Sequence, residues 1–318
     1  MANRIPGLAF LFPGQGSQAT GMGKELAFNH AVARRTFEEA DEALGYDLSK
    51  RCFEGPDEQL RLTEITQPAI LAVSVAVSRV LAEIGIVPSF VAGHSLGEYS
   101  AHVVAGTISF ADAVRAVRLR GQYMQEAVPV GVGTMAAIIA LGIDQIRDAC
   151  TEAIAEFPGQ VCEPANINSP GQVVISGSKP AVKRAAELCK QKGAKRAIML
   201  PVSAPFHSSL MQPAQDRLAA DLRALTFHAP EVPVLCNVEA VPVCEAEKSR
   251  DTLIRQVTGT VQWETSMRNL IANGTTQFVE AGPGSVLTGL LRQIDKAQAC
   301  LNVENEATLQ KAKAHFAK

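Results

Sequence analysis

One serine in this chain lies in a setting that could make it a nucleophile. Ser95 stands in the stretch GHSLGEYS, residues 93–100, between Gly93 and Gly97. The apolar run PSFVA before it predicts a strand, and LGEYSAHVVAG after it is compatible with a helix. On a sharp strand-to-helix turn, glycines relieve crowding and the serine projects its hydroxyl into a cleft as a nucleophile elbow. The pattern therefore predicts either such an elbow or a turn that merely needs small residues.

A serine hydroxyl is a poor nucleophile unless a base takes its proton, and His207 is the candidate base. It follows a predicted strand and a turn at Pro205 in PVSAPFHSSLM, and a loop at a strand end is where a rigid scaffold positions catalytic groups. His94 lies inside the turn, and we expect its side chain to point away from that of Ser95. The other histidines fall in predicted helices, at helix ends or near the chain terminus, and we expect them to be packed or solvated: His30, His102, His228 and His315.

Gln15 and Arg120 are two further candidates. Gln15 places a side-chain amide on the glycine-rich turn FPGQGSQATGMG, residues 12–23, where it could support a polar network near an oxyanion. The same turn fits a dinucleotide-binding pattern, but the acidic residues about 20 positions later, FEEADE, have a helical rather than a strand-end pattern. Arg120 shares a helical segment with Arg115 and Arg118, and the three cannot all face the same way. A buried arginine would need an anionic partner, and guanidinium matches a carboxylate with two hydrogen bonds.

Strand-like apolar runs alternate with helical patterns, which predicts an α/β fold with a largely parallel sheet. GLAFLF and PSFVAG are predicted strands, residues 31–45 a helix ending in glycine, and residues 66–85 a long helix with Pro68 in its first turn. Residues 131–200 have the order strand, helix, strand, strand, helix, strand, a ferredoxin-like pattern. We therefore predict a large subdomain of residues 1–130 and 201–318, a small inserted subdomain of residues 131–200, and a site in the cleft between them.

Composition excludes several classes of protein. The 318 residues carry a formal net charge of −2, so no basic surface argues for nucleic acid or an anionic membrane. Seven cysteines without a C-x-x-C pair make disulfides and structural zinc unexpected. The apolar stretch of residues 69–86 is interrupted by Arg79 and Glu83 and is interpreted as a buried core helix. We expect a soluble, cytoplasmic monomer.

With these residues in place, the chain resembles the malonyl-CoA:acyl carrier protein transacylases of fatty-acid synthesis. The resemblance covers nearly the whole chain in family order. Its matching stretches are FPGQGSQ, TQPAILA, AGHSLGEYSA, RGQYMQEA, ANINSPGQVVISG, PVSAPFH, RQVTGTVQW and EAGPGSVLTGL. It implies an α/β-hydrolase-like subdomain with a ferredoxin-like insertion, malonyl-CoA as donor and holo acyl carrier protein as acceptor. It also implies no metal and no redox cofactor.

The resemblance implies a role for each candidate residue. Ser95 would carry the acyl group as an ester, and His207 would act as general base and then general acid. The backbone carbonyl of Gln256, rather than an acidic side chain, would orient the histidine. The remaining roles would be an oxyanion site formed by the backbone amides of Gln15 and Leu96, a malonyl carboxylate held by Arg120, and a further polar contact from Asn166. Phe206 stands where many stand-alone bacterial members have serine, which leaves the tolerance for other acyl groups open.

Two other functions fit parts of the sequence. A serine thioesterase or esterase would use the same elbow, although such enzymes follow the order serine, acid, histidine, and no acid stands out here. A non-catalytic nucleotide-binding module would use the glycine-rich turn around Gln15. Release of free malonate would favour the first, and nucleotide binding without acylation of Ser95 would favour the second.

Overall fold

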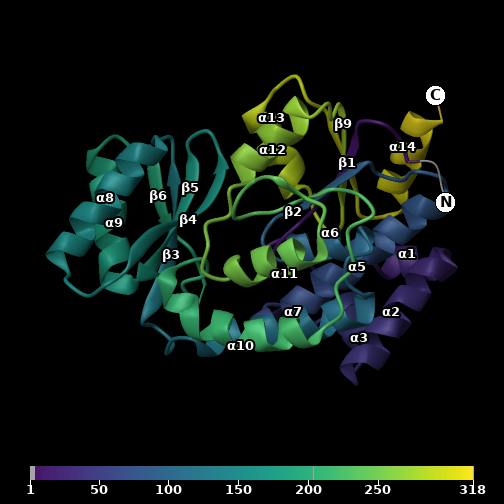
Figure 1. Ribbon diagram of the computed structural model, residues 1–318, viewed down its shortest axis with the longest axis horizontal. Helices are drawn as coiled ribbons and strands as arrows, with labels where there is room; N and C mark the ends of the chain where they lie inside the picture. Colours follow the sequence, from purple (N-terminus) through teal and green to yellow (C-terminus); the bar gives the residue numbers. More distant parts are fainter. Residues whose placement is uncertain (1–3, 203, 318) are drawn as a thin grey trace.

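The protein contains two β-sheets, each packed against helices, in a mixed α/β arrangement (Figure 1). The computed structural model describes residues 4–202 and 204–317. The larger sheet is parallel except for its last pair, which is antiparallel. Its six strands lie in the order β10 (Cys300–Val303), β9 (Gln277–Ala281), β1 (Leu8–Phe12), β2 (Phe90–Gly93), β7 (Val234–Leu235) and β8 (Pro242–Val243).

The smaller sheet is entirely antiparallel and is formed by a continuous part of the chain. Its strands lie in the order β4 (Cys162–Ser169), β5 (Gln172–Ser178), β3 (Gly133–Ile139) and β6 (Arg196–Met199). Helices α8 (Ile143–Glu156) and α9 (Lys179–Gln191) pack on this sheet at one end of the molecule in Figure 1. The predicted order of strands and helices in this segment is therefore present.

The remaining helices surround the larger sheet. Alternate residues of β1 face opposite sides of it, as the period of a strand requires. Leu8, Phe10 and Phe12 face a core that includes α2, α5 and α7, whereas Ala9 and Leu11 face α12 and α13. The helices are α1 (Lys24–Asn29), α2 (Ala31–Leu44), α3 (Leu48–Glu54), α4 (Asp57–Leu60), α5 (Thr63–Glu83), α6 (Gly97–Val104), α7 (Phe110–Glu126), the 3₁₀ turn η1 (Ser209–Met211), α10 (Gln212–Ala224), α11 (Ala246–Arg255), α12 (Trp263–Ala272), α13 (Val286–Ile294) and α14 (Glu306–Phe316).

Helix α5 is the apolar stretch that was predicted to be a core helix, and this is confirmed. It is long and apolar enough to cross a membrane, but 89% of its most apolar window is buried inside the protein. The prediction for Pro68 was wrong, because α5 begins at Thr63 and Pro68 is its sixth residue. The amides of Ile65 and Thr66 donate to the Leu62 carbonyl, so the helix starts before the stretch that the apolar pattern marked.

The glycine-rich loop around Gln15 and the turn at Ser95 follow the carboxyl ends of β1 and β2, which pair in parallel. In open α/β sheets, this edge is where ligands bind. The loop after β1 carries Gln15, and the turn after β2 carries Ser95. The His94 amide donates to the Phe12 carbonyl at 3.0 Å and ties the two loops together.

Candidate active site

The turn at Ser95 has the strained strand-to-helix geometry of a nucleophile elbow. Ser95 has φ = 51°, a left-handed conformation that non-glycine residues seldom adopt, and α6 begins two residues later. A Cβ on Gly93 would lie 1.9 Å from the Gly97 carbonyl, and one on Gly97 would lie 2.1 Å from the Phe12 oxygen. Both glycines are therefore required for the close approach of strand and helix. Such backbone strain persists only where the surrounding structure enforces it, and it concentrates at functional sites.

His207 lies against the serine, although 112 residues separate them in the chain. The Ser95 Oγ and His207 Nε2 atoms are 2.7 Å apart. His207 Nδ1 lies 2.9 Å from the Gln256 carbonyl oxygen and 3.1 Å from that of Gly259. Because carbonyls only accept, the proton of a neutral imidazole must sit on Nδ1, and Nε2 is left to accept from the serine hydroxyl.

The imidazole is neutral at neutral pH. Burial, and then the Arg120 charge, lower the pKa of His207 to about 3. His207 also has a left-handed backbone, with φ = 56°. The Gln256 contact lies where the resemblance places it, whereas Gly259 was not singled out. A backbone carbonyl acts whatever its side chain is, so no residue type could have revealed Gly259.

Arg120 is a buried cation beside Ser95. Its side chain is 2% exposed, and burial lowers its pKa. Nη2 donates to Ser95 Oγ at 3.1 Å and to Gln256 Oε1 at 3.0 Å, and Nη1 donates to Gln67 Oε1 at 2.8 Å. Within the described ranges, no carboxylate lies in salt-bridge distance of Arg120 and its Nε has no partner. The guanidinium is thus held by neutral groups and retains capacity for an incoming anion.

The other arginines of α7 face elsewhere, as their spacing predicted. Arg115 pairs with Asp112 on the surface, and Arg118 lies over the Tyr46 ring. A helix turns by about 100° per residue, so positions 115, 118 and 120 cannot share one face. Of these three arginines, Arg120 is the one that lines the cleft.

The backbone amides of Gln15 and Leu96 are the predicted oxyanion donors. In the described part of the chain, neither the Gln15 nor the Leu96 amide has a hydrogen-bond acceptor, whereas the Ser95 amide donates to Asn237 Oδ1 at 2.7 Å. Leu96 is the N-cap of α6, where the helix dipole favours negative charge. The Gln15 side chain donates to Thr63 Oγ1 at 3.4 Å and so lies on the same side of the cleft as the start of α5.

These groups lie around one cavity of about 680 Å³. Gln15, Ser95, Leu96, Arg120, Asn166 and His207 all line it, and of the predicted site residues only Gln256 lies outside the lining. Asn166 comes from β4 of the smaller sheet, and its backbone bridges to Val261. The cavity is therefore bounded by both sheets. His94 lines it too, with Nε2 bonded to Asn168 Oδ1 at 2.8 Å and its ring beside Trp263.

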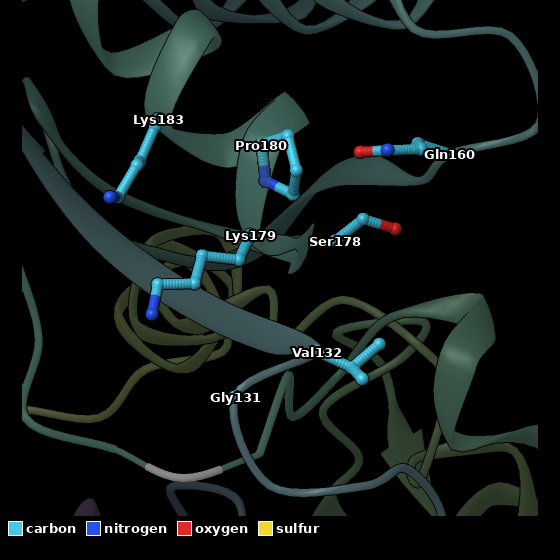
Figure 2. A pocket seen from close by; sticks show the side chains of 7 residues that line it. All are labelled: Gly131, Val132, Gln160, Ser178, Lys179, Pro180 and Lys183. Carbon is cyan, nitrogen blue, oxygen red and sulfur yellow. The ribbon is translucent and has the colours of Figure 1, made fainter.

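A second cavity, of about 640 Å³, lies at the start of α9 (Figure 2). Lys179 and Lys183 extend from the helix on one side of it, and Gln160 and Ser178 lie on the other. It contains none of the predicted site residues. The two cavities are similar in volume, so the chemistry of their linings, rather than their size, identifies the first as the candidate active site.

Two buried groups in α6 next to the site have strongly shifted pKa values. Burial raises the pKa of Glu98 to about 7 and lowers that of His102 to about 3. Their side chains are fully buried, with His102 Nε2 4.0 Å from Glu98 Oε1. His102 thus contributes a neutral imidazole to the core, and neither of its nitrogens has a hydrogen-bond partner in the part of the chain that the structure describes.

We predict that His102 makes stability depend on pH. Its folded pKa lies below the unfolded value of about 6.5, so the unfolded chain binds the proton first, and stability falls as the pH drops from about 6.5 toward 3. Replacing His102 with leucine should reduce that slope by about 1.4 kcal/mol per pH unit. Denaturant unfolding at several pH values between 4.5 and 7.5 measures it. The same substitution at the exposed His315 is the control and should leave the slope as it is.

Comparison with known proteins identifies the family. The model of the acyl transferase domain family matches residues 9–315. Malonyl CoA-acyl carrier protein transacylase of Escherichia coli K12 is 53% identical over 287 residues, 90% of this chain and 92% of that protein. Its counterpart in Bacillus subtilis strain 168 is 48% identical over 305 residues, 96% of each chain.

Solved structures agree with these relatives. The crystal structure of an acyl carrier protein S-malonyltransferase from Vibrio cholerae is 50% identical, with a TM-score of 0.93, and covers 96% of this chain and 99% of that one. A malonyl-transacylase in complex with its type II PKS acyl-carrier protein is 48% identical, with a TM-score of 0.94, and covers 97% and 99%. The resemblance found in the sequence is therefore confirmed, and this chain belongs to the acyl transferase domain family, alongside the malonyl CoA-acyl carrier protein transacylases.

Proposed function

We propose that this protein transfers a malonyl group from malonyl-CoA to the phosphopantetheine thiol of an acyl carrier protein, by way of an ester on Ser95. The observation that carries the proposal is that one hydroxyl contacts both a neutral imidazole and a buried guanidinium. Ser95 Oγ lies 2.7 Å from His207 Nε2 and 3.1 Å from Arg120 Nη2. The first contact supplies a base, and the second places a carboxylate receptor within reach of the reacting carbon. The names and identities of the relatives support the same donor and acceptor.

In the first half-reaction, His207 takes the Ser95 proton as the oxygen attacks the thioester carbonyl carbon. The tetrahedral oxyanion forms beside the amides of Gln15 and Leu96, and each such donor contributes about 3–4 kcal/mol in related enzymes. The C–S bond then breaks, and the proton on His207 passes to the departing sulfur of CoA. In the second half-reaction, the carrier thiol gives its proton to His207, attacks the ester carbon and displaces Ser95, which recovers the proton.

The Gln256 and Gly259 carbonyls take the place of an acidic side chain in orienting His207. Two carbonyl oxygens on Nδ1 favour the tautomer in which Nε2 accepts, and they partly offset the burial that disfavours the imidazolium. They add no negative charge to a site that must bind a malonyl anion. A carboxylate in their place would repel that substrate.

The positive charge of Arg120 would make the site select malonyl over an uncharged acyl group. The Arg120 charge is one of the causes that lower the pKa of His207. A malonyl carboxylate bound to the guanidinium would offset that charge, so the pKa of His207 would rise and its basicity with it. The substrate carboxylate would thus both anchor the donor and strengthen the base, which an acetyl group cannot do.

We further propose the division of the chain that the sequence suggested. An α/β-hydrolase-like subdomain of residues 1–130 and 201–318 would carry Ser95, Arg120 and His207, and a ferredoxin-like subdomain of residues 131–200 would contribute Asn166 from the opposite wall. The strand order β4-β5-β3-β6 and the continuous chain segment of the smaller sheet support this division. Asn166 would make a polar contact to the bound acyl group.

Intact-protein mass spectrometry tests the proposed function directly. Mixing the enzyme with malonyl-CoA should add one malonyl group to Ser95, and a chase with holo acyl carrier protein should move that group to the carrier. An adduct that decays to free malonate without reaching the carrier would instead indicate a serine hydrolase. If Ser95 never becomes acylated, the proposal is wrong.

A further inference from the structure

We propose that Glu98 is a positioning residue for acyl transfer, because its carboxylate accepts from the Asn237 backbone amide and from Gln256 Nε2, and the side chains of these two residues hold Ser95 and Arg120 in place. This inference rests on the proposed function and extends it to a residue that the sequence did not single out. Glu98 lies three residues after the nucleophile, and its side chain is fully buried in α6. It does not line the cavity, and its carboxylate bonds to Asn237 and Gln256 rather than to Ser95 Oγ, so it acts through other groups.

One carboxylate oxygen of Glu98 accepts two hydrogen bonds from buried groups. Glu98 Oε2 accepts from Gln256 Nε2 at 2.6 Å and from the Asn237 amide at 3.0 Å. Gln256 and Asn237 are themselves fully or almost fully buried, at 0% and 1% exposed. Buried polar groups of this kind fix a single arrangement only when every partner is present. Removing Glu98 Oε2 would take away the acceptor of the Asn237 amide and one of the acceptors of Gln256 Nε2.

The side chains of Asn237 and Gln256, both in contact with Glu98, bond to the backbone amide and the backbone carbonyl of Ser95. Asn237 Oδ1 accepts from the Ser95 amide at 2.7 Å, and Asn237 Nδ2 donates to the Gly93 carbonyl at 2.7 Å. Gln256 Nε2 donates to the Ser95 carbonyl at 2.9 Å. These three contacts surround the residue with the left-handed backbone. They therefore supply the external constraint that the elbow requires.

The same network reaches the carboxylate receptor. Gln256 Oε1 accepts from Arg120 Nη2, while its Nε2 faces Glu98. Since a guanidinium only donates and Glu98 Oε2 here accepts, the Gln256 amide can adopt one orientation only. Arg120, Gln256 and Glu98 form a chain from the cleft to the core, which fixes the guanidinium beside Ser95.

The role needs an acceptor oxygen and not a charge. Glu98 Oε1 has no hydrogen-bond partner among the described residues, so a proton or an amide nitrogen can occupy that position without breaking a hydrogen bond. Glutamine at this position can keep its oxygen at the Oε2 site and accept from both donors. Methionine has a similar length but offers no comparable acceptor.

The test compares Glu98→Gln with Glu98→Met in folded protein, using single-turnover acylation by malonyl-CoA and by acetyl-CoA. For the methionine variant we expect malonyl acylation to slow by about 10- to 100-fold, as a misplaced nucleophile does, and the malonyl-to-acetyl rate ratio to fall. The glutamine variant should remain within about threefold of wild type in both readouts, because the acceptor is retained. A loss of packing alone would lower the melting temperature without changing the ratio.

Glu280 provides the matched control. It is also fully buried, and it accepts from the Leu287 and Thr288 amides at the start of α13. Glu280→Met should lower thermal stability and leave the malonyl-to-acetyl ratio unchanged. If Glu98→Met does not fold, Gln256→Met removes the linking amide but keeps the carbonyl that orients His207, and it should lower the same ratio.

The outcomes separate this inference from the proposed function. If the wild type forms no malonyl adduct, the proposed function fails. If the wild type forms the adduct and Glu98→Met acylates as fast and as selectively, this inference alone is wrong. Equal impairment of the glutamine and methionine variants would also overturn it, since the acceptor oxygen would then not be the feature that matters.

Discussion

Replacing Ser95 with alanine is expected to abolish the malonyl adduct and to lower the transfer rate by at least about 10,000-fold. Loss of the nucleophile removes the covalent route entirely, and in a serine enzyme what survives comes from the oxyanion site and substrate binding. Among residues 4–202 and 204–317, Ser95 supplies the one hydroxyl in hydrogen-bond contact with His207 Nε2. Intact mass after malonyl-CoA treatment and steady-state transfer to the carrier measure the two effects. A covalent adduct in the alanine variant would show that another residue is the nucleophile.

A glycine variant at the same position separates catalysis from strain. Ser95→Gly should be as inactive as Ser95→Ala, yet more stable by about 1 kcal/mol, since glycine adopts φ = 51° without the Cβ clash. Denaturant unfolding of the two variants gives the difference. Equal stability would mean that the elbow stores little backbone strain.

The sequence predicted much of this site because its groups lie on regular elements with local signals. Ser95 lies between glycines that the close approach of β2 and α6 requires. Arg120 is a cation in a helix whose other two arginines do not line the cavity. His207 could be placed on a loop but not paired, because no periodicity links it to a residue 112 positions away. The expected start of α5 was wrong because the apolar pattern marks burial, whereas the helix begins where Leu62 accepts its first hydrogen bonds.

The supporting groups could not be found in the same way. Gln67, Asn237 and Glu98 are polar residues whose spacing in the sequence gives no indication of which groups they contact. Only the folded arrangement shows that Asn237 and Gln256 contact the same carboxylate oxygen. Gly259 acts through its carbonyl, so it carries no residue-type signal at all.

Replacing Arg120 with alanine is expected to lower kcat/KM for malonyl-CoA by roughly 30- to 4,000-fold, because removing one partner of a buried charge pair costs about 2–5 kcal/mol. The loss should be specific to the charged donor. Acetyl-CoA offers no carboxylate to lose, and without the guanidinium charge the pKa of His207 should rise, which strengthens the base. The malonyl-to-acetyl ratio of kcat/KM is therefore the decisive readout.

Arg120→Lys is the control that isolates geometry from charge. Lysine keeps the positive charge but cannot donate at once to Gln67, Gln256 and a carboxylate in the planar arrangement of the guanidinium. We expect an intermediate ratio, with malonyl still preferred. If the alanine variant keeps the wild-type ratio, Arg120 does not select the acyl group, and the buried cation must serve another purpose. If lysine performs as well as arginine, charge alone sets the preference, and the fixed contacts of the guanidinium to Gln67 and Gln256 contribute nothing to it.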